Sequence, residues 1–184
     1  GNVLKLVKEL GLEQNTIVVF TSDNGTTHLK LEVDYDFFES VKPLRGLKGS
    51  LYEGGGRVPL IVKWPGKIPA GATSDEFLTS LEILPTLCAA TGAVPPKGVT
   101  LDGFDMLSVL QGKRASARAE MFWQRKLDKA ARVGHWKWVK SSRGSGLFDL
   151  RRDIGERRDL SEERPEILKR VQARFANWKK QMQA

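Results

Sequence analysis

The stretch TIVVFTSDNG, residues 16–25, constrains the fold of this chain more than any other part of the sequence. Residues 17–20 are β-branched or aromatic and do not alternate with polar residues, which predicts a strand covered on both faces. Asp23 and Asn24 follow this strand closely. In an open α/β sheet, sites lie at the carboxyl ends of strands, and carboxylate and amide oxygens suit calcium or magnesium. An ordinary turn after the strand is the alternative that this stretch alone leaves open.

The other elements expected in the first part of the chain fit an α/β sandwich. The sequence predicts an amphipathic helix within residues 1–14, a second strand at 60–64, a helix at 79–92 and a short helix at 102–113. A long stretch rich in glycine and charge separates the two strands and lacks any sustained periodicity. A loop of this length inside a compact domain is usually functional.

The pattern changes near residue 115, where short strand-like runs replace the helices. EMFWQRK, AARVG, KWVKS and GLFDL are separated by Gly, Ser and charged residues, which predicts a small antiparallel sheet. A helix is expected from about Pro165 to Met182. Its apolar stripe would cover the sheet and consists of Ile167, Leu168, Val171, Phe175, Trp178 and Met182. We therefore expect a division into residues 1–117 and 118–184.

The charge of the chain is unevenly distributed, which bears on its partners. The formal net charge is +8, and residues 111–184 hold 20 Lys and Arg against 9 Asp and Glu. Such a segment suits an anionic polymer or a solvated surface. Nucleic acid is disfavoured because neither zinc-finger spacing nor an RNA-binding aromatic motif accompanies it. No apolar run is long enough for a membrane span, and the single cysteine, Cys88, is expected to be a core residue.

A second candidate site lies in LRGLKGSLYEGGGRVP, residues 44–59. Lys48 stands between Gly46 and Gly49, and such small residues let a backbone approach an anion closely. The spacing is not that of a P-loop, because Gly rather than Ser or Thr follows the lysine. A solvated loop lysine is the alternative for Lys48 taken alone.

Taken together, the segments resemble the sulfatase family of the alkaline-phosphatase superfamily over nearly the whole chain. The resemblance rests on five pieces in family order: FTSDNG, FFESVKPLRGLKGSLYEGGGRVPLIVKWPGKIPAG, LTSLEILPTLCAATGAVPP, LDGFDMLSVLQG, and a tail with ARVGHWKWVK, LFDL and ERRDLSEERPEI. It implies a partial alkaline-phosphatase-like α/β sandwich followed by a small antiparallel sheet with a C-terminal helix. It also implies a sulfuric ester hydrolase acting on a sulfated small molecule or polysaccharide, in the periplasm or secreted.

The resemblance implies a role for each matching residue. Asp23 and Asn24 would bind a calcium ion, and Lys48 would contact the sulfate ester as a fixed positive charge. His28 could act as a general acid on the leaving group, although a plain loop histidine is the alternative. Residues 53–55 would shape the loop, and Arg57 would anchor it.

Two departures from the family pattern stand out. Gly56 replaces a residue that is usually β-branched in the family. The Cys/Ser-x-Pro/Ala-x-Arg motif, whose first residue becomes the formylglycine nucleophile, does not occur in these 184 residues. The nucleophile and the remaining calcium ligands would therefore lie upstream of Gly1. We expect the C-terminal part of a sulfatase, which would be inactive alone and could self-associate.

Two other functions stay open from the sequence. A phosphatase or phosphodiesterase of the same superfamily is the first, but those sites typically pair aspartate with histidine around zinc. Asn24 instead argues for calcium and sulfate. The second is a non-catalytic module that binds anionic glycans through the basic segment.

Overall fold

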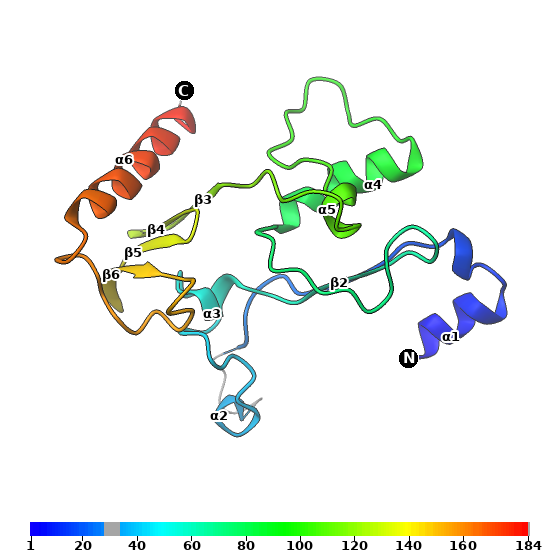
Figure 1. Cartoon of the computed structure of the whole chain (residues 1–184), viewed down its shortest axis with the longest axis horizontal. Helices are drawn as coiled ribbons and strands as arrows, with labels where there is room; N and C mark the ends of the chain where they lie inside the picture. The colour runs from blue at the N-terminus through cyan, green and yellow to red at the C-terminus, as the bar shows by residue number, and fades with distance from the viewer. Residues whose placement is uncertain (28–33, 184) are drawn as a thin grey trace. The chain divides into compact units, whose positions relative to one another are not determined.

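The computed structural model describes residues 1–27 and 34–183. The chain forms two compact units, one from Gly1–Thr21 with Leu60–Ala119 and the other from Ser22–Pro59 with Glu120–Ala184. Their elements can be followed along the chain by colour in Figure 1. The break after Ala119 lies next to the expected division at residue 117. The second unit, however, also takes in residues 22–59, which that division assigned to the first part.

The first unit contains the strands and helices that the sequence predicts. Helix α1 (Asn2–Glu9) and the short 3-10 helix η1 (Glu13–Asn15) precede strand β1 (Val18–Thr21). Strand β2 (Leu60–Lys63) pairs with β1 in an antiparallel two-stranded sheet. A second 3-10 helix, η2 (Ser80–Glu82), leads into α4 (Ile83–Thr91), and α5 (Leu107–Leu110) follows.

The β1–β2 sheet is covered on one face only, so the expectation of a strand buried on both faces is wrong within the described chain. Val19 and Val62 are register partners and line a small apolar cavity with residues of α4 and α5. Their neighbours Phe20 and Ile61 are also register partners, but both are exposed, Phe20 to 59% and Ile61 to 61%. The physical reason is that helices pack against one side of the pair, and side chains alternate between faces along a strand.

Helix α4 shows the local signals that the sequence predicts. Thr79 and Glu82 form a capping box, and Gly92 ends the helix in the left-handed conformation with φ 74°. The helix starts late, at Ile83, so Pro85 falls in its first turn, where its missing N–H costs no hydrogen bond. Cys88 is half-buried on this helix.

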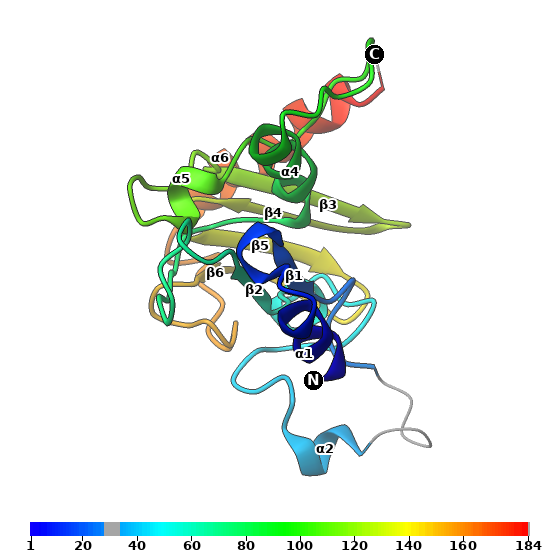
Figure 2. The same cartoon turned by 90° about the vertical axis from the view of Figure 1, so that its right-hand side faces the viewer.

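The second unit is built on an antiparallel meander. Strands β3 (Glu120–Arg125), β4 (Asp128–Val133), β5 (Trp136–Ser141) and β6 (Gly144–Asp149) lie in the order β3-β4-β5-β6 (Figure 2). Helix α6 (Pro165–Gln181) follows, close to its predicted range. Two short helices, α2 (Tyr35–Phe38) and α3 (Glu53–Gly56), belong to the same unit. No helix in the described ranges is long and apolar enough to cross a membrane.

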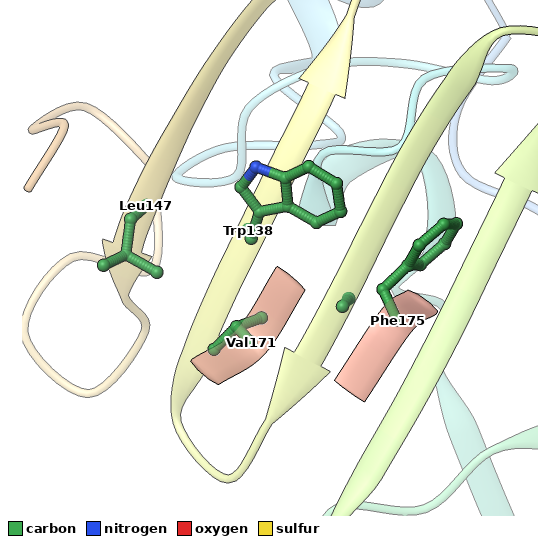
Figure 3. Packing of buried hydrophobic residues seen from close by; sticks show 5 residues of the cluster. Trp138, Leu147, Val171 and Phe175 are labelled. Carbon is green, nitrogen blue, oxygen red and sulfur yellow. The ribbon is translucent and has the colours of Figure 1, made fainter. Parts of the chain in front are cut away.

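Helix α6 covers one face of the four-stranded sheet, as its stripe predicts. Val171 and Phe175 of the helix pack on Ala131, Trp138 and Leu147, and all five are at most 7% exposed (Figure 3). Ile167, Leu168 and Trp178 pack around this cluster. Met182, which the stripe included, follows the last helical residue and is 60% exposed.

The opposite face of the sheet is covered by residues 44–57, which we call the Lys48 loop. Tyr52 of this loop packs with Ala130, Val139 and Phe148 of three successive strands, and these residues are nearly fully buried. Trp138 faces α6 while its neighbour Val139 faces the Lys48 loop, as the period of two along a strand requires. The glycine-rich segment is therefore packed on the four-stranded sheet through Tyr52.

Candidate functional site

Asp23 and Asn24 point their side chains toward each other. The Asn24 amide Nδ2 donates a hydrogen bond to Asp23 Oδ1 at 2.9 Å. The Ser22 hydroxyl donates to the backbone oxygen of Asn24 at 2.9 Å, which tightens the turn between them. Asp23 is exposed and Asn24 is half-buried. The pair thus presents carboxylate and amide oxygens from one short segment.

The Lys48 loop lies directly against this segment. The Lys48 N–H donates to the backbone oxygen of Thr26 at 2.8 Å, and the Gly25 N–H donates to the backbone oxygen of Gly55 at 3.1 Å. These two bonds join residues 22–27 to both ends of the glycine-rich turn. Lys48 is exposed, which leaves its charge accessible to an anion.

Close backbone packing explains why glycines are needed here. A Cβ added at Gly25 would lie 1.9 Å from the backbone oxygen of Gly54, and one at Gly55 would lie 2.2 Å from that of Ser50. Both contacts are with backbone, so no side-chain rotation could relieve them. Gly56 differs, because nothing lies within 4 Å of the place that a Cβ would occupy there, and its φ is not positive. Of the residues expected to shape the loop, Gly54 and Gly55 therefore have to be small, since a Cβ at either position would meet a backbone oxygen.

An open cavity of about 470 Å³ lies beside the joined segments. Asn24 and Thr26 line it, together with Leu44, Gly54 and Arg57 of the Lys48 loop. Arg57 also approaches Glu53, with 3.9 Å between its Nη1 and the Glu53 Oε2. The cavity is wide enough for a small polar ligand, and among the described residues that line it Arg57 is the cationic one.

His28 lies outside the described residues. Among the residues that the structure describes, no group of three or more His, Cys, Asp and Glu gathers in one place. Asp23 and Asn24 therefore offer a cation a pair of oxygen-bearing side chains and not a full coordination sphere, which for calcium has about six to eight ligands.

A buried ionic cluster stands beneath the Lys48 loop, and the sequence interpretation missed it. Lys137 Nζ donates to Glu53 Oε1 at 2.6 Å and lies 3.9 Å from Glu156 Oε1. The Glu53 N–H donates to Glu156 Oε2 at 2.6 Å. The exposed fractions of Glu53, Lys137 and Glu156 are 6%, 2% and 0%. Alternation in WKWVK could have indicated the buried lysine, because Lys137 shares a face with Val139.

The two acids of this cluster have opposite pKa shifts. Burial raises the pKa of Glu156 to about 7, against the attraction of Lys137. Burial acts on Glu53 in the same direction, but Lys137 and the nearby Arg132 and Arg57 hold its pKa below the usual value. Glu53 is therefore the ionised partner of Lys137, and Glu156 is close to half-protonated near neutral pH.

Comparison with known proteins identifies the family. The Sulfatase family model matches residues 1–93. Arylsulfatase A of Homo sapiens is 36% identical over 159 residues, which are 83% of this chain and 30% of that protein. An N-acetylgalactosamine-6-O-sulfatase of Bacteroides thetaiotaomicron is 28% identical over 194 residues, covering 93% of this chain and 38% of its own length.

Solved structures agree with this result. The crystal structure of Ps i-CgsB in complex with k-i-k-neocarrahexaose matches with a TM-score of 0.80 and 28% identity, over 97% of this chain and 39% of that chain. The fold is thus the expected partial alkaline-phosphatase-like α/β sandwich, followed by an antiparallel sheet and a C-terminal helix. This chain spans 30% and 38% of the lengths of the two curated relatives named above. The chain belongs to the sulfatase family.

Proposed function

We propose that this chain contributes the calcium-binding and sulfate-binding residues of a sulfuric ester hydrolase. The observation that supports this function best is the pair of backbone hydrogen bonds between residues 22–27 and the Lys48 loop. These bonds bring an Asp–Asn pair and the backbone of an exposed lysine into one small region. A site for a hard cation and an anionic ester needs such a combination.

Asp23 and Asn24 would be two of the calcium ligands. Asn24 uses its amide nitrogen to bond Asp23 Oδ1, so its amide oxygen and Asp23 Oδ2 are the atoms suited to a cation. Because two residues fall short of the coordination that calcium takes, we propose that further ligands come from outside this sequence. A bound calcium ion would neutralise negative charge on the sulfate oxygens.

Lys48 would hold the sulfate group as a fixed positive charge. The general-acid role of His28 stays a prediction. The Cys/Ser-x-Pro/Ala-x-Arg motif is absent from these 184 residues, so we propose that residues outside this sequence contribute the formylglycine nucleophile. We accordingly expect the 184-residue chain alone to show no turnover, because removing a covalent nucleophile leaves little catalysis.

We propose a sulfated sugar as the substrate class. The relative from Bacteroides thetaiotaomicron is named for a 6-O-sulfated N-acetylgalactosamine, and the structural neighbour Ps i-CgsB holds a neocarrahexaose. The excess of Lys and Arg in residues 111–184 suits an anionic polymer of this kind. A periplasmic or secreted location stays a prediction.

The experiment that tests this function compares lysine variants in a longer protein that includes this chain and the nucleophile motif. With an aryl sulfate and calcium, Lys48→Ala should lower kcat by about 100-fold or more, as the loss of a group that stabilises developing charge does. Lys42→Ala is the matched control, since Lys42 is exposed and pairs with Glu39 at 2.5 Å. It should change kcat by no more than roughly twofold. Equal activity of the two variants would refute the role of Lys48.

A non-catalytic glycan-binding module makes a different prediction. Binding of a sulfated polymer would then survive Lys48→Ala and be lost when basic residues of 111–184 are neutralised. Hydrolysis of a phosphate ester in preference to a sulfate ester by the longer protein would instead favour the phosphatase alternative.

A further inference from the structure

Both segments of the candidate site are attached to the backbone of α3. The Gly25 N–H donates to Gly55 O at 3.1 Å, and the Gly54 N–H donates to Arg45 O at 2.7 Å. The contact of Gly25 with Gly54 is so close that even a methyl group could not fit between them. A shift of α3 would therefore move Asp23 and Asn24 on one side and the Lys48 turn on the other.

Helix α3 is itself held at its first residue, Glu53. The Glu53 N–H donates to Glu156 Oε2, and the Glu53 carboxylate accepts from Lys137 Nζ, both at 2.6 Å. The bond to Glu156 holds the backbone of Glu53, and the bond to Lys137 holds its side chain. Together they fix both the position and the rotation of the first turn of α3. Arg45 Nη1 adds a bond to the backbone oxygen of Glu156 at 2.9 Å.

These groups cannot act on a substrate directly, because Lys137 and Glu156 are at most 2% exposed. A buried ion pair also adds little stability over apolar residues of the same size, whereas its hydrogen bonds are directional. Tyr52, Val139 and Phe148 already provide apolar contact between the Lys48 loop and the sheet. The polar cluster is therefore better suited to fixing a geometry than to adding stability.

We propose that Lys137 and Glu156 are positioning residues of the sulfate site, which hold Glu53 and, through α3, the segments of Gly25 and Lys48. In this arrangement the four-stranded sheet β3–β6 supports the Lys48 loop. That these segments bind sulfate rests on the function proposed above. The contact itself can be tested without assuming that function.

The test is amide hydrogen exchange of the 184-residue chain followed by NMR. Lys137→Met keeps the length of the side chain and removes its charge and its bond to Glu53. Because Lys137→Met leaves the buried Glu53 carboxylate without its partner, exchange should become faster throughout the unit. We expect the increase at the Gly25 and Lys48 amides to exceed the increase at the amides of β5 by about tenfold. General destabilisation alone would accelerate the amides of β5 by the same factor as these two amides.

Arg174→Met is the matched control, because it removes an ion pair on the α6 side of the same sheet. Arg174 Nη2 lies 2.5 Å from Glu120 Oε1. The control should leave the Gly25 and Lys48 amides unchanged. If Lys137→Met does not fold, Glu53→Gln is measured in the same way, since it keeps the N–H bond to Glu156. Unchanged exchange at both site amides, or an equal rise along β5, overturns the proposal.

A sulfate titration separates this proposal from the proposed function. Inorganic sulfate is added while the chemical shift of the Lys48 amide is followed, and Lys137→Met should weaken the apparent affinity by about tenfold. If the unsubstituted chain shows no sulfate-dependent shift at Lys48, the proposed function fails for this chain. The exchange rates still decide whether Lys137 positions the loop.

Discussion

Glu156→Gln tests the charge state of the buried cluster through the pH dependence of stability. Glu156 is fully buried, and its pKa rises from 4.5 to about 7 mainly because burial penalises the charged form. The Oε1 atom of this carboxyl lacks a hydrogen-bond partner among the described residues, with Lys137 Nζ 3.9 Å away. Charged and polar groups facing it are Lys137 on β5, Glu53 on α3 and Arg45 in the Lys48 loop.

The sign of the effect follows from the direction of the shift. Because the folded pKa lies above the unfolded value, the folded state binds this proton more tightly. The resulting stability is fully present below pH 4.5 and is lost as the pH rises through 7. Because one pKa unit corresponds to about 1.4 kcal/mol, the rise in the Glu156 pKa from 4.5 to about 7 corresponds to about 3 to 4 kcal/mol when the full pH range is crossed.

Glutamine keeps an acceptor for the Glu53 N–H and cannot ionise. Between pH 5 and pH 8, the original protein should therefore lose more unfolding free energy than the variant, by about 2 to 3 kcal/mol. Urea unfolding followed by tryptophan fluorescence measures this, and Trp123, Trp136, Trp138 and Trp178 all lie in the unit concerned. His135, whose pKa is lowered by burial and by Arg151, titrates in both proteins and cancels.

The control is Glu120→Gln, which neutralises an accessible acid on the same sheet. It should lower the unfolding midpoint by a similar amount at every pH between 5 and 8, because Glu120 pairs with Arg174 near the surface. Identical pH slopes for the original protein and Glu156→Gln would show that Glu156 is ionised at pH 5 and above, and that the cluster carries two negative charges.

Two stability predictions concern packing. Gly25→Ala should disrupt the junction and cost about 2 kcal/mol or more, since its Cβ meets a backbone oxygen at 1.9 Å, whereas Gly56→Ala should be neutral or stabilise by up to about 1 kcal/mol. Equal unfolding midpoints in urea for the two glycine variants would contradict the packing argument. Phe175→Ala should cost about 3–5 kcal/mol, and Trp178→Ala less than that, because Phe175 is 5% exposed and Trp178 is only half-buried. A larger loss for Trp178→Ala in the same urea titration would show that Trp178, and not Phe175, makes the main contact of α6 with the sheet.

The sequence is informative wherever structure depends on near neighbours. The periodicity of 165–182 predicts α6, the short runs after 117 predict the meander, and the capping residues of α4 are local as well. Asp23, Asn24 and Lys48 can be proposed as site residues from the sequence because the motif around each is short, and their roles stay predictions. Burial on both faces of β1 is not found within residues 1–27 and 34–183, because an apolar run does not reveal how many layers cover it.

The ionic cluster could not be predicted because its members are far apart along the chain. Lys137 is 84 residues from Glu53, and Glu156 is 103 residues from it, so no local pattern links them. A buried lysine can be suspected from the alternation of β5, but its partner depends on which segment covers that face. The face toward α6 carries the apolar cluster around Val171 and Phe175, whereas the face toward the Lys48 loop combines Tyr52 and Phe148 with the ionic cluster. Apolar contacts tolerate small sliding movements, but two directional bonds at Glu53 do not. The two faces thus differ in how the covering segment is held: apolar contacts hold α6, whereas the Lys48 loop has directional bonds at Glu53 as well, which agrees with the positioning role proposed above.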